Sequence, residues 1–165
     1  MRHGFIKTAT ATPSIRVADC QYNADQILTL VRRAHEEGIH LLVLPELCIT
    51  GYTCQDLFRG TYLLDKSDEA LIDLLRYCRE LPIVVIVGAP VRQDNRLFNA
   101  AVVLAGGTYY TVNKTYLPNY GEFYEKRWFS PEGVNNPPTI FELPSGVKFA
   151  IEVCEDLWSP LPPSS

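Results

Sequence analysis

The sequence has no strong excess of charge of either sign. Its 165 residues carry 15 Lys and Arg against 19 Asp and Glu, which gives a formal net charge of −4. No run of like charges forms a basic or acidic arm. Nucleic acids and anionic membranes attract proteins through clustered cations. We therefore expect neither a nucleic acid nor a membrane among the partners of this chain.

Long hydrophobic runs are missing as well. The most apolar stretches, residues 39–45 and 81–90, are far shorter than the roughly 18 residues that a membrane helix needs. The first 13 residues lack the apolar segment of a signal peptide. The five cysteines are odd in number, far apart and without a C-x-x-C pair, and a chain of this length buries a core without disulfides. These absences predict reduced thiols and a cytoplasmic location.

Metal-binding and phosphate-binding motifs are absent too. The sequence contains neither G-x-x-x-x-G-K-[ST] nor G-x-G-x-x-G, and it has no internal repeat. None of His3, His35 and His40 has metal-ligand spacing to a cysteine, so surface or structural roles are favoured for all three. We expect no metal site and no cofactor in this chain.

Hydrophobic periodicity predicts alternating strands and helices in the first half. A short β-prone stretch covers residues 5–12, and a helix over residues 23–37, capped by Asp19 or Asn23, carries apolar residues at spacings of three and four. A second helix, with Ser67 as its cap, is predicted over residues 68–79. The short apolar runs at 39–44 and 83–87 are typical of strands buried on both faces.

The second half predicts hairpins and a long loop. Gly106 and Gly107 lie between two β-prone runs and suit the turn of an antiparallel pair. Residues 117–138 hold several prolines and many aromatics without a period, which is typical of a functional loop. Two further strands are predicted at 139–143 and 147–153. The fold class is therefore α/β with a mixed sheet, central strands at 39–44 and 83–87, and both helices on one face.

Three polar residues stand where apolar strands end. Glu46 follows the run 39–44, Lys114 follows the hairpin strand, and Cys154 follows the last predicted strand. Each alone has an ordinary interpretation, as a surface glutamate, a solvated lysine and a buried structural thiol. Together they supply a base, a cation and a nucleophile at the edge of a sheet where active sites collect.

The blocks around these residues carry a family resemblance. LVLPELCITGY, VNKTYLPNYGEFYEKRWF and FAIEVCEDLW resemble the three signature regions of the carbon-nitrogen hydrolase (nitrilase) superfamily, which uses a Glu-Lys-Cys triad. The continuation GYTCQDLF and the block KTYLPNYGEFYEKRWF resemble, more narrowly, the glutaminase domains of glutamine-dependent NAD+ synthetases. The resemblance implies part of a nitrilase-like α-β-β-α sandwich.

The resemblance also implies roles for particular residues. Glu46 is expected to be the general base, Lys114 the electrostatic stabiliser and Cys154 the nucleophile. Glu122 matches a further glutamate of the superfamily that hydrogen-bonds and positions the lysine side of the site.

Three further positions match the amide pocket of the glutaminase branch. Tyr52, Tyr120 and Glu155 are expected to line this pocket, with the Glu155 carboxylate available to the ammonium group of the substrate. The backbone N–H of Glu155 is a candidate donor to the oxyanion.

By the same resemblance, the chain is expected to release ammonia from glutamine or another small amide. In the family, this ammonia serves NAD+ synthesis from nicotinate adenine dinucleotide (deamido-NAD+) in a synthetase domain that uses ATP and Mg²⁺. We expect residues 1–165 to form one glutaminase domain that is incomplete at its C-terminus, without the synthetase domain. An uncovered sheet edge would recruit partners, so we also expect a homo-oligomer.

Other functions stay open at this stage. The chain could be a free-standing amidase or nitrilase of another substrate, or a Cys-His hydrolase that uses Cys154 and His40. It could also be an inactive fragment or an interaction module. The Cys-His alternative predicts that replacing His40 abolishes thiol reactivity and that replacing Lys114 does not.

Overall fold

The computed structural model describes residues 5–134 and 136–165. Within them, one five-stranded sheet has the order β1-β2-β3-β4-β5, with β1 (Thr8–Thr10), β2 (Leu41–Val43), β3 (Val84–Gln93), β4 (Arg96–Ala105) and β5 (Thr108–Asn113). The first three strands are parallel, and β3, β4 and β5 are antiparallel. The predicted mixed sheet and the interior positions of the two apolar strands are confirmed.

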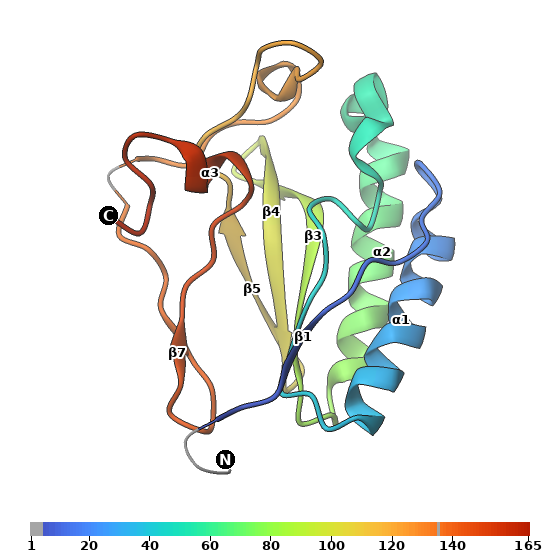
Figure 1. Ribbon diagram of the computed structural model, residues 1–165. Helices are drawn as coiled ribbons and strands as arrows, with labels where there is room; N and C mark the ends of the chain where they lie inside the picture. Colours follow the sequence, from blue (N-terminus) through green and yellow to red (C-terminus); the bar gives the residue numbers. More distant parts are fainter. Residues whose placement is uncertain (1–4, 135) are drawn as a thin grey trace.

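Two helices cover one face of this sheet. Helix α1 (Cys20–Glu36) is capped by the Asp19 carboxylate, which accepts a hydrogen bond from the Tyr22 backbone N–H. Helix α2 (Thr61–Cys78) lies beside it, and Figure 1 shows both on the same side of the strands. The prediction that both helices share one face is therefore confirmed.

The start of α2 differs from the prediction. The helix begins at Thr61 without a side-chain cap, and Ser67 lies buried inside it with no partner for its hydroxyl among the described residues. Leu63 and Leu64 extend the apolar stripe of Ala70 and Leu74 toward the N-terminus. Burial of these two leucines against the core outweighs the local capping signal at Ser67.

Two tight turns fold β3, β4 and β5 into a meander. Gly106 and Gly107 both have positive φ, as the predicted turn between β4 and β5 requires. The turn between β3 and β4 was not anticipated, and there Asp94 and Asn95 adopt positive φ values of 49° and 61°. Both residue types tolerate this conformation better than most.

A small hairpin lies across the other face of the sheet. The strands predicted at 139–143 and 147–153 form only short pairs, β6 (Phe141–Glu142) and β7 (Lys148–Phe149), in a separate sheet. Phe141 and Phe149 stack with ring centroids 5.2 Å apart. With Val103 and Val153 they form a small apolar cluster against the sheet. Figure 1 shows β7 opposite the helices.

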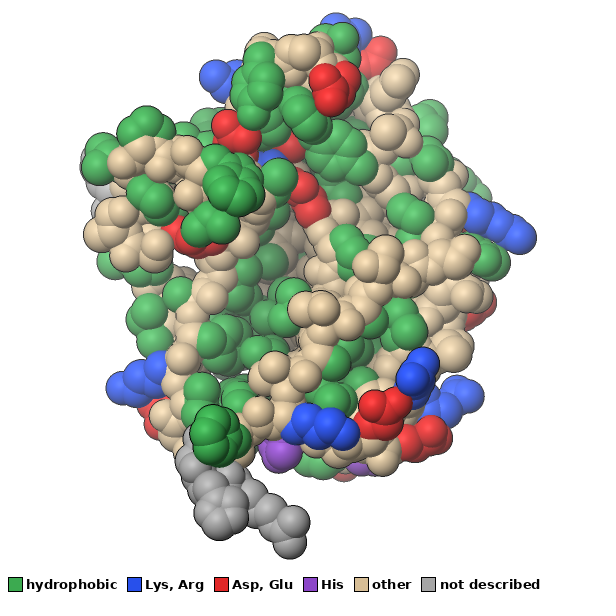
Figure 2. All heavy atoms as spheres, viewed as in Figure 1, with side chains coloured by type: hydrophobic (Ala, Val, Ile, Leu, Met, Phe, Trp, Pro, Cys, Tyr) green, Lys and Arg blue, Asp and Glu red, His purple; other side chains and the backbone are tan. Residues whose placement is uncertain are grey.

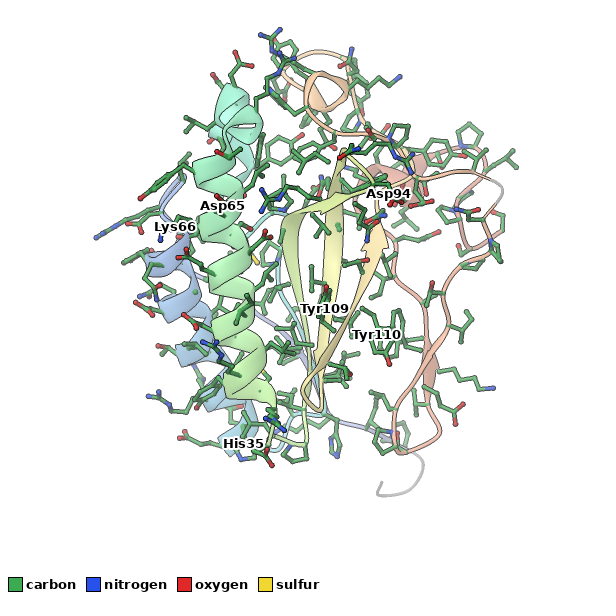
Figure 3. All side chains as sticks on the ribbon, turned by 180° about the vertical axis from the view of Figure 1, so that it is seen from behind. His35, Asp65, Lys66, Asp94, Tyr109 and Tyr110 are labelled. Atoms are coloured by element: carbon green, nitrogen blue, oxygen red, sulfur yellow. The ribbon has the colours of Figure 1, made fainter. Side chains whose placement is uncertain are left out.

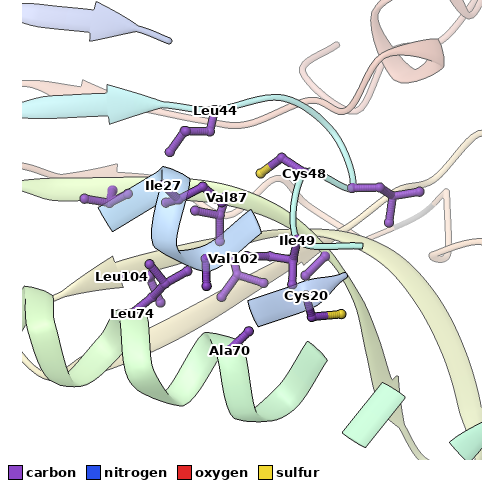
Figure 4. Packing of buried hydrophobic residues seen from close by; sticks show 14 of the residues in the cluster. Cys20, Ile27, Leu44, Cys48, Ile49, Ala70, Leu74, Val87, Val102 and Leu104 are labelled. Carbon is purple, nitrogen blue, oxygen red and sulfur yellow. The ribbon is translucent and has the colours of Figure 1, made fainter. Parts of the chain in front are cut away.

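The main core fills the space between the helices and the sheet. Ile27 of α1, Leu74 of α2, and Val87 and Val102 of the sheet are all buried there, as Figure 4 shows. The predicted loop after β5 is confirmed and contains one short 3-10 helix, η2 (Glu125–Arg127). Another 3-10 segment, η1 (Tyr52–Arg59), and the short helix α3 (Glu155–Trp158) complete the fold.

Candidate active site

The carboxyl ends of β2 and β5 bring two of the three predicted residues to one edge of the sheet. Glu46 lies three residues after β2, and Lys114 directly follows β5. Cys154 directly precedes α3, which Figure 1 shows at the same end of the molecule. In Figure 2, acidic side chains gather at this end beneath the hydrophobic side chains of the upper surface. The arrangement follows the general rule for sites in α/β sheets.

Lys114 is the centre of a buried ion cluster. Its side chain is fully buried, and its Nζ donates to Glu46 Oε1 at 2.7 Å and to Glu125 Oε1 at 2.8 Å. A buried ammonium needs such partners, because burial without them costs several kcal/mol. The pairing of Glu46 with Lys114 agrees with the sequence analysis.

The second carboxylate of this cluster is Glu125, which corrects the assignment of Glu122. Glu122 is exposed, and the hydrogen bonds of Lys114 go to the other two glutamates. Glu125 begins η2 and is only 1% exposed. Because η2 turns the chain at this point, the glutamate three residues further along, and not Glu122, points into the core.

The carboxylates of Glu46 and Glu125 differ in how many of their oxygens accept hydrogen bonds. Glu125 Oε1 accepts hydrogen bonds from Lys114 and from the Tyr52 hydroxyl, and its Oε2 accepts one from Asn99. Glu46 Oε1 accepts from Lys114 and Asn99, whereas Oε2 of Glu46 has no donor among the described residues. Glu125 is thus engaged at both oxygens, and Glu46 keeps one oxygen free to take a proton.

Burial and the neighbouring charges shift the pKa values of Lys114 and Glu125. Burial alone would lower the pKa of Lys114, but the charges and hydrogen bonds of Glu46 and Glu125 raise it above its usual value. Burial raises the pKa of Glu125, and the Glu46 charge adds to this effect, although Lys114 and Tyr52 oppose it. One ammonium thus faces two carboxylates in a largely dry site.

Cys154 occupies a sharp turn beside this cluster. Its thiol is exposed, and its backbone has φ 50° and ψ −100°, a conformation that a residue with a side chain adopts at a cost. Burial of part of the side chain and the charge of Glu46 raise the pKa of Cys154, and Lys114 opposes them. Little free thiolate is therefore expected at neutral pH, so proton transfer to a nearby base is needed for attack.

Asp156 fastens this turn to the lysine segment. Its Oδ1 accepts hydrogen bonds from the backbone N–H groups of Thr115 and Tyr116 at 3.0 and 2.7 Å, and its Oδ2 accepts one from Val153 at 3.1 Å. The side chain is 2% exposed. One buried carboxylate therefore sets the position of Lys114's neighbours relative to the cysteine turn.

Aromatic side chains form one wall of the site. Phe123 makes edge contacts with the rings of Tyr52 and Tyr120, at centroid distances of 6.2 and 5.6 Å. The Tyr120 hydroxyl donates to Glu155 Oε2 at 2.8 Å, which links the long loop to α3. The three residues predicted to line the amide pocket therefore lie on this wall, where Tyr52 also holds Glu125.

An ion pair secures the aromatic loop against η1. Arg127 donates to both carboxylate oxygens of Asp56, and the Trp128 indole donates to the same group. These donors hold the pKa of Asp56 well below its usual range. A hollow of about 280 Å³ beside the pair is lined by Gln55, Asp56, Tyr124, Arg127 and Trp128. The loop that carries Glu125 is thus held on both sides of this residue, at Tyr120 and at Arg127.

His35 and His40 lie away from the thiol, which argues against the Cys-His alternative with His40. His40 precedes β2, at the amino end of the strand whose carboxyl end leads to Glu46, and it lines a hollow with Pro82 and Pro144. His35 is on α1, and His3 lies outside the described residues. No charge of a histidine contributes to the pKa shift of Cys154.

Two further features concern only the described residues. Residues 5–134 and 136–165 contain no group of three or more His, Cys, Asp or Glu side chains placed to hold a metal ion. In the same part of the chain, no helix combines the length and apolar content needed to cross a membrane.

Three residues of the site were missed by the sequence analysis. Asn99 interrupts the apolar strand FNAAVVL, and a polar residue inside such a run is a signal that could have been used. Asp156 lies two positions after the cysteine, in the first turn of α3, where acidic residues are favoured. Glu125 differs from Glu122 only by the turn of η2, so no local pattern could separate them.

Comparison with protein families matches the carbon-nitrogen hydrolases over residues 7–163. Among curated proteins, the glutamine-dependent NAD(+) synthetase of Mycobacterium tuberculosis strain H37Rv is 36% identical over 182 aligned positions, which cover 99% of this chain. The synthetase of Thermotoga maritima is 31% identical over 90% of the chain. The chain spans only about a quarter of these relatives' length (26% and 25%).

Solved structures give the same grouping. A glutamine-dependent NAD(+) synthetase from Cytophaga hutchinsonii superposes with a TM-score of 0.74 at 30% identity, over 88% of this chain and 24% of that one. An amidase from Nesterenkonia sp. AN1, with the acetamide moiety of fluoroacetamide attached at its active site cysteine, gives a TM-score of 0.82 at 25% identity. That superposition covers 97% of this chain and 59% of the amidase.

Proposed function

The chain belongs to the carbon-nitrogen hydrolase family, and from that premise we propose that it hydrolyses the side-chain amide of glutamine. Cys154 is the nucleophile, Glu46 the general base and Lys114 the electrostatic stabiliser. The observation that carries the proposal is the buried Lys114–Glu46 pair with one free carboxylate oxygen beside an exposed, strained cysteine. The names of the relatives support glutamine as the amide donor.

The first half of the reaction forms a thioester. The Cys154 sulfur attacks the amide carbon while its proton passes to the free oxygen of Glu46. Two of the three Lys114 ammonium protons are held by carboxylates, so the third is available to the oxyanion, together with the Glu155 N–H. Ammonia leaves with the proton returned by Glu46, as general acid-base catalysis requires.

The second half regenerates the thiol. A water molecule gives a proton to Glu46 and adds to the thioester carbon, and the sulfur leaves and recovers its proton. The products of one cycle are ammonia and glutamate. We assign Tyr52, Tyr120 and Glu155 to the pocket for the substrate, and Glu125 to holding Lys114. No step needs a metal ion or cofactor from this chain.

We also propose a destination for the ammonia. The curated relatives are named for NAD+ synthesis, and this chain corresponds to about a quarter of their length. The ammonia would serve amidation of nicotinate adenine dinucleotide, with ATP and Mg²⁺ acting in the synthetase and not in residues 1–165. Those residues form one glutaminase domain in this proposal.

A second candidate is an amidase for another small amide. Its support is the Nesterenkonia amidase, which superposes on nearly the whole chain with a TM-score of 0.82. Both candidates share the chemistry at Cys154. They differ only in the amide substrate that fits against the aromatic wall. Ammonia release from glutamine and from acetamide, measured side by side, separates them.

The test of the shared chemistry compares matched glutamate variants. We expect Cys154→Ala to abolish ammonia release, and Glu46→Gln to lower kcat by on the order of 10² to 10⁴. Glu125→Gln should lower it as well, because Lys114 loses a partner, whereas Glu122→Gln should stay within about twofold of the unsubstituted chain. Equal losses in the two loop variants, or activity without Cys154, would contradict the proposal.

Alkylation of Cys154 by iodoacetamide gives an independent measurement. Because the charge of Glu46 raises the pKa of Cys154, Glu46→Gln should move the pH midpoint of alkylation downward while ammonia release is lost. Cys48, whose pKa burial raises to about 11, serves as the slow internal reference. If Glu46→Gln leaves the midpoint unchanged, and the midpoint equals that of a cysteine in a short peptide, an interaction module would be favoured instead.

A further inference from the structure

Asn99 bonds to both carboxylates of the cluster through its side chain and to Lys114 through its backbone. It lies near the amino end of β4, which runs antiparallel to β3 and β5 and therefore begins at the edge where those strands end, as Figure 1 shows. The residue is 0% exposed. Its Nδ2 donates to Glu46 Oε1 at 2.6 Å and to Glu125 Oε2 at 3.3 Å. Its backbone carbonyl accepts the N–H of Lys114 at 2.8 Å.

The orientation of this side-chain amide is fixed by charge. Both Nδ2 protons point at carboxylate oxygens, while Oδ1 is buried without a partner among the described residues. Turning the amide over would place Oδ1 against two carboxylates and leave both of their oxygens without these donors. The fold thus keeps an unpaired buried oxygen, which costs stability, in order to present two donors to the glutamates.

These contacts decide which carboxylate oxygen can accept a proton. Asn99 and Lys114 both bind Oε1 of Glu46, so its second oxygen alone is free of donors. A carboxylate that could rotate would share the donors between its two oxygens. Asn99 removes that freedom and at the same time donates to Oε2 of Glu125.

We propose that Asn99 is a positioning residue of this active site, which fixes the proton-accepting oxygen of Glu46 and bridges the two glutamates on opposite sides of Lys114. The inference rests on the proposed function for its catalytic meaning. Its structural part is that Asn99 controls the negative charge facing Cys154. This part can be tested by alkylation of the thiol, which needs no substrate. Asn99 touches neither the thiol nor the substrate, so it acts only through the glutamates.

The expected effect has a definite sign. Without the two N–H donors, the negative charge of the carboxylates is less well satisfied and opposes formation of the thiolate more strongly. The charges of Glu46, Lys114 and Glu125 act on the thiol, and the hydroxyls of Tyr52 and Tyr120 couple with it. Glu155 acts on it through its backbone N–H. Among these groups the Asn99 side chain bonds to Glu46 and Glu125, so its loss should move the pH midpoint of Cys154 alkylation upward.

The experiment replaces Asn99 and a matched asparagine. Asn23 on α1 is equally buried, and its side chain bonds to the backbone of Arg16 and Ile49 and to none of the three charged groups of the cluster. Asn99→Leu should raise the midpoint by about one pH unit, which is about tenfold less thiolate at a given pH. Asn23→Leu should lower stability toward urea without moving the midpoint. Equal midpoints in the two variants overturn the inference.

Two further arms keep the outcomes separate. If Asn99→Leu does not fold, Asn99→Ser carries the test, since one short hydroxyl cannot reach both carboxylates and the midpoint should still rise; an unchanged value overturns the inference. Ammonia release from glutamine by the unsubstituted chain tests the proposed function itself. If Asn99→Leu shifts the midpoint but the unsubstituted chain releases no ammonia, the proposed function is rejected and the role of Asn99 is retained. If ammonia is released and the midpoint does not shift, the proposed function is retained and the role of Asn99 is rejected.

Discussion

At the residue scale, the feature that defines this protein is a lysine with no solvent exposure between two glutamates. The ammonium and the two carboxylates sum to one negative charge in a site where burial raises the proton affinity of Glu125. Such a cluster adds little to stability, because desolvation offsets the attraction. Its retention is explained by chemistry, since a poised base and a fixed cation need this surrounding.

Loss of the lysine should therefore make stability depend on pH. In Lys114→Met the two carboxylates face each other without a cation, and we expect the free energy of unfolding to fall by about 3 kcal/mol or more near pH 7.5. The pKa of Glu125 is already raised in the folded state, and removal of Lys114 raises it further. The folded state then gains stability on binding a proton, so the deficit should shrink toward about pH 5.

Urea unfolding at the two pH values measures this effect. Lys66→Met is the control, because Lys66 forms an exposed ion pair with Glu69 and its loss should cost no more than about 1 kcal/mol at either pH. The double variant Lys114→Met/Glu125→Gln should recover part of the loss near pH 7.5. A deficit for Lys114→Met that is independent of pH would show that the cluster is not charged as described.

At the element scale, two close approaches place the side chains that we propose for catalysis. The cysteine turn before α3 is held by Asp156, and the segment that carries Glu46 lies directly on β3 at Gly88. The backbone N–H of Ile49 donates to the Gly88 carbonyl, and Leu47 adopts a positive φ of 49°. Glycine is needed at position 88 because another chain segment occupies the space of a side chain, and not because of its φ.

Although Gly88→Ala adds only one methyl group, it should lower both the stability of the chain and the rate of ammonia release. The added Cβ would lie 2.2 Å from the Leu47 nitrogen and 2.6 Å from the Glu46 carbonyl carbon, so the Glu46 segment must move away from β3. We expect a loss of at least about 2 kcal/mol in the free energy of unfolding, measured in urea. Since misplacement by about 1 Å can cost on the order of a hundredfold in rate, ammonia release should fall as well.

Gly133→Ala is the matched control for this substitution. Its added Cβ would meet only the Asn136 side chain, at an ordinary 3.5 Å, so its stability should change by no more than about 0.5 kcal/mol. Similar losses in the two alanine variants would mean that the close approach at Gly88 does not position Glu46.

At the scale of the whole molecule, the sheet has two edges. Within the described residues, β1 pairs only with β2 and β5 only with β4. Beside β5, a groove of about 350 Å³ lies between α2 and the edge of the sheet. Its lining residues include Leu71, Ile72 and Tyr109. Tyr109 and Tyr110 follow one another on β5 (Figure 3), where Tyr109 lines this groove and Tyr110 contacts Phe141 of the hairpin on the other face. Exposed strand edges with apolar side chains promote association.

We therefore expect the chain to self-associate through this edge. Tyr109 is 61% exposed, and Tyr109→Lys places a charge beside the open strand, so it should shift light-scattering masses toward the monomer. Tyr62→Lys, on α2 and 76% exposed, should leave the distribution unchanged. A monodisperse monomer before substitution, or an equal response of both variants, would contradict association through β5.

The sequence by itself determined the elements and the residues with reactive chemistry. Apolar periodicity located both helices and the interior strands, because burial against one core imposes spacings of three and four on helices and continuous apolar runs on central strands. Glu46, Lys114 and Cys154 could be named because each follows or ends such a run. The start of α2 was misjudged, since tertiary burial of Leu63 and Leu64 outweighed a local cap.

Only the tertiary structure decided which groups satisfy the buried lysine. Glu122 and Glu125 lie three residues apart in one loop, and the turn of η2 alone buries the second against Lys114. Asn99 meets Glu46 across 53 positions of sequence, through strand pairings that no local pattern encodes. A buried charge is stabilised by the groups nearest to it in space, so the sequence was enough to propose the reacting groups, and only the folded chain shows which residues hold Lys114.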